Sequence, residues 1–124
     1  MAKNWTTFLQ DHSRLPETVD EAVERLLSVL EDEHKAVLAF MQEEDLIDLH
    51  FSLGMAIRNA FDLQVPRSKL LASCAVVHPD DASGLIIQAL WRRFKSIIRS
   101  LSVYLSKRII FVLLFPGFLA SSHL

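Results

Sequence analysis

The strongest constraint on the fold is an apolar stripe that keeps a helical period through the last third of the chain. On a helical wheel that starts at Leu85, the polar and basic residues fall on one side. The other side, between about 100° and 240°, is apolar or aromatic. It carries Ile86, Ile87, Leu90, Trp91, Phe94, Ile97, Ile98, Leu101, Tyr104 and Leu105. The phase holds for about 20 residues, or about 30 Å, which predicts a long amphipathic helix that begins near Asp80.

The rest of the chain also favours helices. Thr18 and Glu21 have the spacing of a capping box, and apolar residues follow them at helical spacing. Ser68 is a candidate cap for a short helix, and loops are expected at 62–67 and 75–79. The expected helices cover residues 18–31, 33–42, 44–61 and 69–74. The sequence therefore predicts an all-α, single-domain bundle of four or five helices, with the last helix projecting beyond the core.

Charge is divided along the chain. Through Gly84, seven basic residues stand against fifteen acidic ones, a balance of −8, and after Gly84 six basic residues stand against none. The six are Arg92, Arg93, Lys95, Arg99, Lys107 and Arg108. A basic amphipathic helix suits an acidic partner protein or an anionic membrane surface. We expect such a contact over residues 92–120, while the neighbouring acidic domain disfavours nucleic-acid binding.

Cysteine content and the apolar runs bear on location. Cys74 is the only cysteine, so an internal disulfide is impossible, which suits a reducing compartment. The first 12 residues lack the apolar core of a signal peptide. The longest apolar run, from Ile109 to Ala120 with one interruption, is shorter than the roughly 20 residues that span a bilayer. We expect a cytoplasmic protein, with peripheral attachment to the inner membrane as an alternative.

The segment 44–61 carries three polar or small residues of interest on or beside its apolar stripe. His50 is predicted to point inward, either as a hydrogen-bonded core histidine or in a ligand role. Gly54 is predicted to allow another backbone to approach closely. Arg58 needs a carboxylate partner if it is partly buried, and the Asp80–Asp81 pair is the expected one.

The loop before the last helix combines helix-start chemistry with titratable groups. Pro79 suits the first helical position, and Asp80 and Asp81 suit the first turn. An alternative is a small enzyme or metal-dependent site built on His50, His78, Asp80 and Asp81. Their spacing matches no metal motif, and no nucleotide-binding or nucleophile motif is present, so no metal or cofactor is expected. A non-enzymatic protein-interaction or regulatory module is therefore the first hypothesis.

Two blocks of sequence resemble a known family. They read Leu49-His50-Phe51-x-Leu53-Gly54-Met55-x-Ile57-Arg58-Asn59 and His78-Pro79-Asp80-Asp81-Ala82-Ser83-Gly84-x-Ile86-Ile87-x-x-Leu90-Trp91, with Leu70-Leu71 between them. Together they resemble a small bacterial domain family of unknown function, over about residues 16–95. The resemblance implies a compact helical domain of bacterial origin, within whose motif Gly54, Asn59, Gly84 and Trp91 lie. It implies no reaction.

The resemblance also divides the chain. It makes residues 16–95 the helical domain and residues 96–124 a basic amphipathic and apolar extension. Residues 1–15 show no sustained hydrophobic period, so we expect a loosely ordered lead-in there. Members of the family typically end shortly after the position of Phe94. Two explanations for the extension stay open, a membrane-seeking segment and sequence appended by a change of reading frame. The partner and the oligomeric state are undetermined at this level.

Overall fold

The chain folds into helices, as predicted. A computed structural model describes residues 14–114 and shows no strand among them. The elements are α2 (Val19–Val29), α3 (Asp32–Phe40), η1 (Glu43–Leu49), η2 (His50–Gly54), α4 (Met55–Ala60), α5 (Lys69–Ser73) and α6 (Pro79–Leu114). The all-α class and the long C-terminal helix are therefore confirmed. Most of the lead-in predicted for residues 1–15, and residues 115–124, lie outside the described part of the chain.

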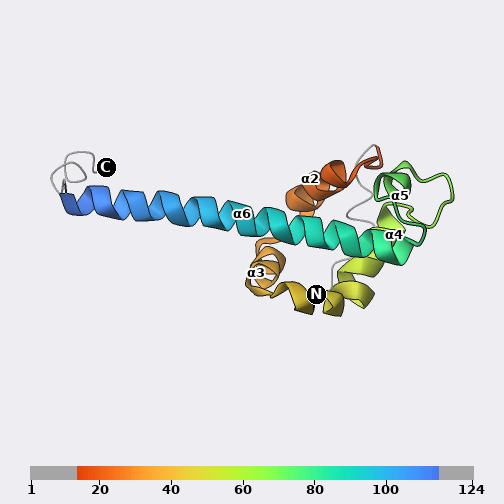
Figure 1. The fold of residues 1–124 in the computed structure, drawn as a ribbon, viewed down its shortest axis with the longest axis horizontal. Helices are drawn as coiled ribbons and strands as arrows, with labels where there is room; N and C mark the ends of the chain where they lie inside the picture. The colour runs from red at the N-terminus through yellow and green to blue at the C-terminus, as the bar shows by residue number, and fades with distance from the viewer. Residues whose placement is uncertain (1–13, 115–124) are drawn as a thin grey trace.

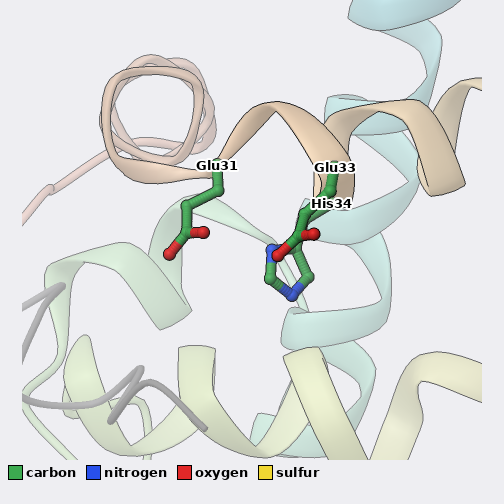
Figure 2. Close-up of side chains that lie close together, drawn as sticks. All are labelled: Glu31, Glu33 and His34. Carbon is green, nitrogen blue, oxygen red and sulfur yellow. The ribbon is translucent and has the colours of Figure 1, made fainter. Parts of the chain in front are cut away.

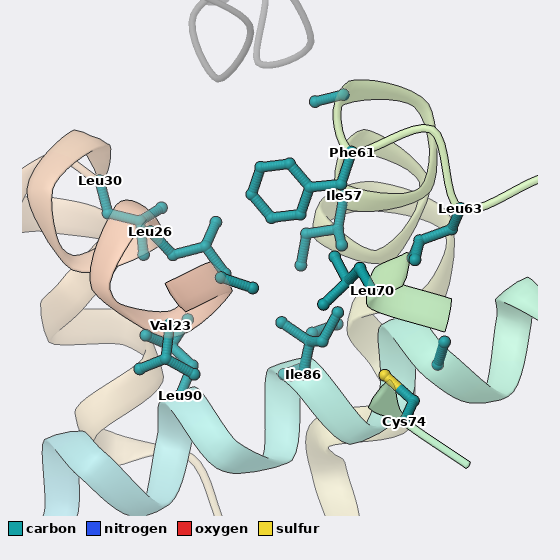
Figure 3. Close-up of a cluster of buried hydrophobic side chains, with 14 of the residues drawn as sticks. Val23, Leu26, Leu30, Ile57, Phe61, Leu63, Leu70, Cys74, Ile86 and Leu90 are labelled. Atoms are coloured by element: carbon teal, nitrogen blue, oxygen red, sulfur yellow. The ribbon is translucent and has the colours of Figure 1, made fainter. Parts of the chain in front are cut away.

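Helix α6 is the axis of the fold (Figure 1). The shorter helices gather around its first half, and its second half extends away from them. The core lies where α2, α4 and α5 meet this first half, and Figure 3 shows its side chains converging there. Its largest fully buried apolar residues are Phe61, Leu26, Ile57, Leu63, Leu70, Ile86, Leu90 and Val23. The core therefore uses only the N-terminal half of a 36-residue helix.

Local capping chemistry sets where the short helices begin. The Thr18 hydroxyl accepts a hydrogen bond from the Glu21 backbone N–H (3.1 Å), and the Ser68 hydroxyl accepts one from the Leu71 N–H (3.0 Å). Both predicted caps are confirmed. In a standard capping box, the Glu21 carboxylate would accept a hydrogen bond from the Thr18 backbone N–H. Here it accepts one from the Glu17 N–H (2.8 Å), one residue earlier.

The segment predicted as one regular α-helix over 44–61 winds in three ways. It begins as the 3₁₀-helix η1, continues as the π-helical turn η2 and ends as α4. Because these windings advance by different angles per residue, a wheel drawn at 100° misplaces its faces. On a wheel of 100° per residue that starts at Leu46, Ile47 and Phe51 belong to the wide apolar stripe, but in the structure they are 74% and 80% exposed. The prediction of one uniform helix was wrong in this segment.

Helix α6 begins at Pro79, as predicted, and continues to Leu114. Phe94 is its last residue described as buried. Beyond that point Ile97, Ile98 and Leu101 expose close to half of their surface. The predicted projection of the last helix beyond the core is confirmed. Among the described residues, no helix combines the length and apolar character needed to cross a bilayer.

The loop after α5 contains a testable point of backbone strain at Ala75, which has a φ of 59°. A Cβ disfavours this left-handed conformation, and glycine does not. We expect Ala75→Gly to raise the free energy of unfolding by about 0.5 kcal/mol, the strain relief slightly exceeding the greater chain entropy of the unfolded glycine variant. Urea denaturation measures the change.

Ala72, three residues earlier in α5, provides the control for this substitution. It is exposed and helical, so Ala72→Gly should cost about 1 kcal/mol. Equal losses for the two glycine variants would contradict strain at Ala75.

Candidate functional site

A groove with a volume of about 500 Å³ opens between η1–η2 and the first turns of α6. We call it the η1–α6 groove. Leu46, Ile87 and Val76 are buried or half-buried in its apolar lining. Ile47 and Leu85 also line it and are exposed. The polar lining contains His50, Ser83, Gln88 and the carboxylates of Glu43, Asp80 and Asp81.

Arg58 is not part of the groove lining, but it contacts residues of both walls. The residue is only 6% exposed. Its Nε lies 3.3 Å from Asp80 Oδ1, its Nη1 donates to Ser83 Oγ (2.9 Å), and its Nη2 donates to the backbone carbonyl of His50 (3.2 Å). The Ser83 hydroxyl in turn donates to the Asp80 carbonyl (3.0 Å). One guanidinium therefore ties η2 to the first turn of α6, and the predicted Arg58 partner is confirmed as Asp80.

Gly54 makes room for this guanidinium. A Cβ at Gly54 would lie 3.1 Å from Arg58 Nη1, 3.3 Å from the Leu49 carbonyl oxygen and 3.6 Å from Ser83 Oγ. The sequence predicted that another backbone would approach Gly54 closely, and the identity of that neighbour was wrong. A side chain of the next turn occupies the space, instead of the backbone of another helix. Because Arg58 is held on three sides, it has little room to yield.

His50 borders the groove and is not enclosed in the core. Its side chain is 27% exposed, and its Nε2 lies 3.9 Å from Asp80 Oδ2. The imidazole packs at a right angle against the Phe51 ring, with centroids 4.7 Å apart. The prediction of a core histidine was therefore wrong, and the change of winding across η1 and η2 is the physical reason.

The alternative acid–base site is only partly assembled. His50, Asp80 and Asp81 all line the groove, but His78 is exposed and is not part of its lining. Gly84 also lines the groove, and nothing lies within 4 Å of where its Cβ would be. Asn59 is exposed on α4, away from the groove lining. The structure thus brings together three of the four titratable residues.

Trp91 and Lys95 fasten α6 to the end of α3. Trp91 Nε1 donates to the Met41 carbonyl (2.9 Å), and Lys95 Nζ donates to the Ala39 carbonyl (2.6 Å). The Lys95 ammonium also lies 5.4 Å from the centroid of the Trp91 ring. Carbonyls at a helix C-terminus lack intrahelical partners and attract cations. Both side chains therefore stabilise the fold.

Two further basic residues are also engaged within the domain. Arg92 pairs with Glu43 (3.2 Å), whose carboxylate also accepts from Gln88 (2.7 Å). Arg93 pairs with Glu24 of α2. Together with Lys95, they account for three of the six basic residues predicted to contact a partner. The available basic surface therefore narrows to Arg99, Lys107 and Arg108, which are exposed on the projecting part of α6.

A second group of titratable side chains lies at the start of α3. The ligand atoms of Glu31, Glu33 and His34 lie within 4.8 Å of one another, and Figure 2 shows the three side chains on the same side of the helix start. Sequence reasoning did not single them out. Carboxylates at a helix N-terminus are stabilised by its dipole, which accounts for both glutamates without a bound ion.

Cys74 contrasts with an activated thiol. It is buried in the core, and burial raises the pKa of its thiol (Figure 3). Because the thiolate is the reactive species, we expect alkylation by iodoacetamide to be at least about tenfold slower in the folded chain than in urea. Its pH dependence should shift to higher pH in the folded chain, and mass spectrometry follows the rate. Equal rates in both states would contradict this burial.

Comparison with known families identifies the domain that carries this groove. The profile of a domain of unknown function, DUF6794, matches residues 15–94. Comparisons with curated proteins and with solved structures found no match. The matched range begins close to the predicted domain start at residue 16 and ends at Phe94, where α6 leaves the core. The chain therefore belongs to the DUF6794 family, whose domain is of unknown function.

Proposed function

We propose that the domain is a non-enzymatic protein-binding module, and that the η1–α6 groove receives a basic amphipathic segment of a partner protein. The observation that carries the proposal is an apolar groove with acidic side chains on its walls. Leu46, Val76 and Ile87 provide an apolar lining, and the exposed Ile47 and Leu85 extend it to the surface. Apolar anchors surrounded by polar residues are typical of protein-binding surfaces.

The charge around the groove supports a basic partner. Glu43 and Asp80 are already paired with Arg92 and Arg58. Asp81 lines the groove and makes no ion pair within the described part of the chain. Three exposed acidic residues of η1, Glu44, Asp45 and Asp48, lie outside the lining but on the helix that forms one wall, and they also make no ion pair within the described residues. Four carboxylates thus remain to attract lysine or arginine side chains, and such complementarity favours encounter and register.

The amphipathic form of the partner follows from the shape of the groove. Its lining combines apolar residues of η1 and of the first turns of α6 with acidic side chains of the same two elements. A helix with one apolar stripe and basic flanks satisfies both parts at once. A small cation would neutralise the carboxylates but would leave Ile47 and Leu85 exposed.

The test uses two designed helical peptides with the same leucine stripe, one with lysine on its polar face and the other with glutamate. The full-length chain is titrated with each by calorimetry. We expect the lysine peptide to bind at least about tenfold more tightly, because exposed charge pairs each contribute up to about 1 kcal/mol. Asp48→Asn/Asp81→Asn should weaken its binding about fivefold.

A matched control removes the same charge elsewhere. Asp20 lies on α2 and Asp62 in the loop after α4, so neither lies on η1 or lines the groove. Asp20→Asn/Asp62→Asn should leave the affinity within about twofold, because exposed charges beyond a Debye length are screened. Equal losses in the two double variants, or equal affinity for both peptides, would refute the proposal. Binding of a synthetic 96–114 peptide alone would identify a second copy as the occupant instead.

A further inference from the structure

We infer that the projecting part of α6, residues 96–114, binds the surface of an anionic lipid bilayer. Its last turns, 109–114, would enter the boundary between headgroups and acyl chains, with Lys107 and Arg108 at the lipid phosphates. This inference concerns a different surface from the η1–α6 groove and is independent of it. Figure 1 shows this part of α6 extending away from the other helices.

The first observation is the exposed apolar surface. From Ile97 onward, α6 exposes large side chains that no other described element covers. They are Ile97, Ile98, Leu101, Val103, Tyr104, Leu105, Ile109, Ile110, Leu113 and Leu114. Contiguous apolar surface of this extent is typical of a contact site for another molecule or a membrane.

The second observation selects a bilayer over a partner helix or a second copy. Residues 109–114 read Ile-Ile-Phe-Val-Leu-Leu. At about 100° per residue, Ile110, Leu113 and Leu114 fall at about 340°, 280° and 20° on the wheel that starts at Leu85, outside the apolar stripe between about 100° and 240°. Ile109, Ile110, Leu113 and Leu114 are all exposed, with Leu113 at 75%. A single neighbouring helix would cover one stripe of this surface, whereas a bilayer surrounds it.

The third observation is the charge that accompanies this apolar end. No acidic residue follows Asp81. Arg99 and Lys107 make no ion pair within the described residues, and the Arg108 guanidinium lies 6.0 Å from the centroid of the Tyr104 ring. Tyrosine and long basic side chains are the groups that settle at a membrane–water interface, with their apolar parts inward. Anionic headgroups are the complementary surface.

Length supports insertion of the tip alone. Six helical residues measure about 9 Å, within the depth of about 5–10 Å that interfacial helices reach. Lys107 and Arg108 directly precede this tip, where their side chains can extend back to the phosphates. The arrangement agrees with the finding that no described helix is apolar over a spanning length.

The acidic domain does not oppose this contact, because α6 holds it at a distance. From Phe94 to Ile109 the helix rises about 22 Å. The Debye length at physiological ionic strength is about 8 Å. Repulsion between the carboxylates of the domain and an anionic bilayer is therefore screened, while the basic residues of the tip lie at the surface.

The test measures partitioning of the full-length chain into vesicles by flotation. One set contains phosphatidylcholine with about 30% phosphatidylserine, and the other contains phosphatidylcholine alone. We expect stronger partitioning into the anionic vesicles, and a decrease as salt is raised. Lys107→Gln/Arg108→Gln should lower the partition coefficient about 30-fold. Ile110→Asp/Leu113→Asp should reduce partitioning to background.

A control variant removes two exposed basic residues from the domain. Arg67→Gln/Lys69→Gln should leave partitioning within about twofold, because neither residue lies on the projecting helix. Thermal unfolding of every variant checks that the domain is intact. Equal absence from both vesicle types, or equal losses in the two basic-residue variants, would overturn the inference. A stable dimer that Ile110→Asp/Leu113→Asp dissociates would assign this surface to a second copy.

Discussion

A Leu90→Ala variant is expected to lose about 3–5 kcal/mol of unfolding free energy, whereas Leu101→Ala should lose less than about 0.5 kcal/mol. The two leucines lie on the same helix, 11 residues apart. Leu90 is fully buried, in the core cluster that also contains Val23 of α2 (Figure 3). Leu101 is 53% exposed. The same deletion thus leaves a cavity at one position and open surface at the other.

Urea denaturation followed by far-UV circular dichroism measures both losses. A domain of about 80 residues has limited stability to lose, so Leu90→Met provides a milder variant that should cost less than about 1.5 kcal/mol. Equal losses for Leu90→Ala and Leu101→Ala would show that residues beyond Phe94 pack into the cooperative core. That result would contradict the boundary placed at Phe94.

The parts of the fold that sequence reasoning predicted well depend on local chemistry. Two helices start after Thr18 and Ser68 because these side chains accept hydrogen bonds from the first backbone N–H groups. A third starts at Pro79, which has no backbone N–H that needs a partner. The stripe of α6 follows from a period that persists over many turns. Such features are encoded within a few residues, so they can be read without knowledge of the neighbours.

The winding of η1 and η2 could not be predicted in this way. A π-helical turn shifts the backbone hydrogen bonds, and the Arg58 guanidinium donates to the carbonyl of His50 at its start. Arg58 is itself fixed by Asp80 and Ser83 on α6. The local conformation therefore depends on a contact with a helix 25 residues further along the chain.

Charge counting placed a change of charge at Gly84, but it did not predict which of the basic residues after it would contact the domain. It grouped Arg92, Arg93 and Lys95 with the three basic residues that follow them. In the structure these three contact the acidic or carbonyl groups of α2, α3 and η1. A net charge does not specify which residues meet in space. One clue was available, since all three lie next to Trp91 or Phe94, apolar residues of the domain.

The same dependence on distant contacts makes Arg58 a sensitive position. Arg58→Ala is expected to lower the free energy of unfolding by about 2–4 kcal/mol. Little of this comes from the ion pair, because the Asp80 side chain is 64% exposed and solvent screens it. Most comes from the buried hydrogen bonds to Ser83 and the His50 carbonyl, and from the space that the side chain fills.

Two further variants separate these contributions. Asp80→Asn removes the ion pair but keeps the other contacts of Arg58, so it should cost less than about 1 kcal/mol. Arg58→Lys keeps the charge, but a lysine ammonium cannot reproduce the planar fork that reaches three partners. We expect it to lose nearly as much as Arg58→Ala in urea denaturation. Full stability of Arg58→Lys would show that the charge alone matters, and would contradict a role for Arg58 in holding η2 against α6.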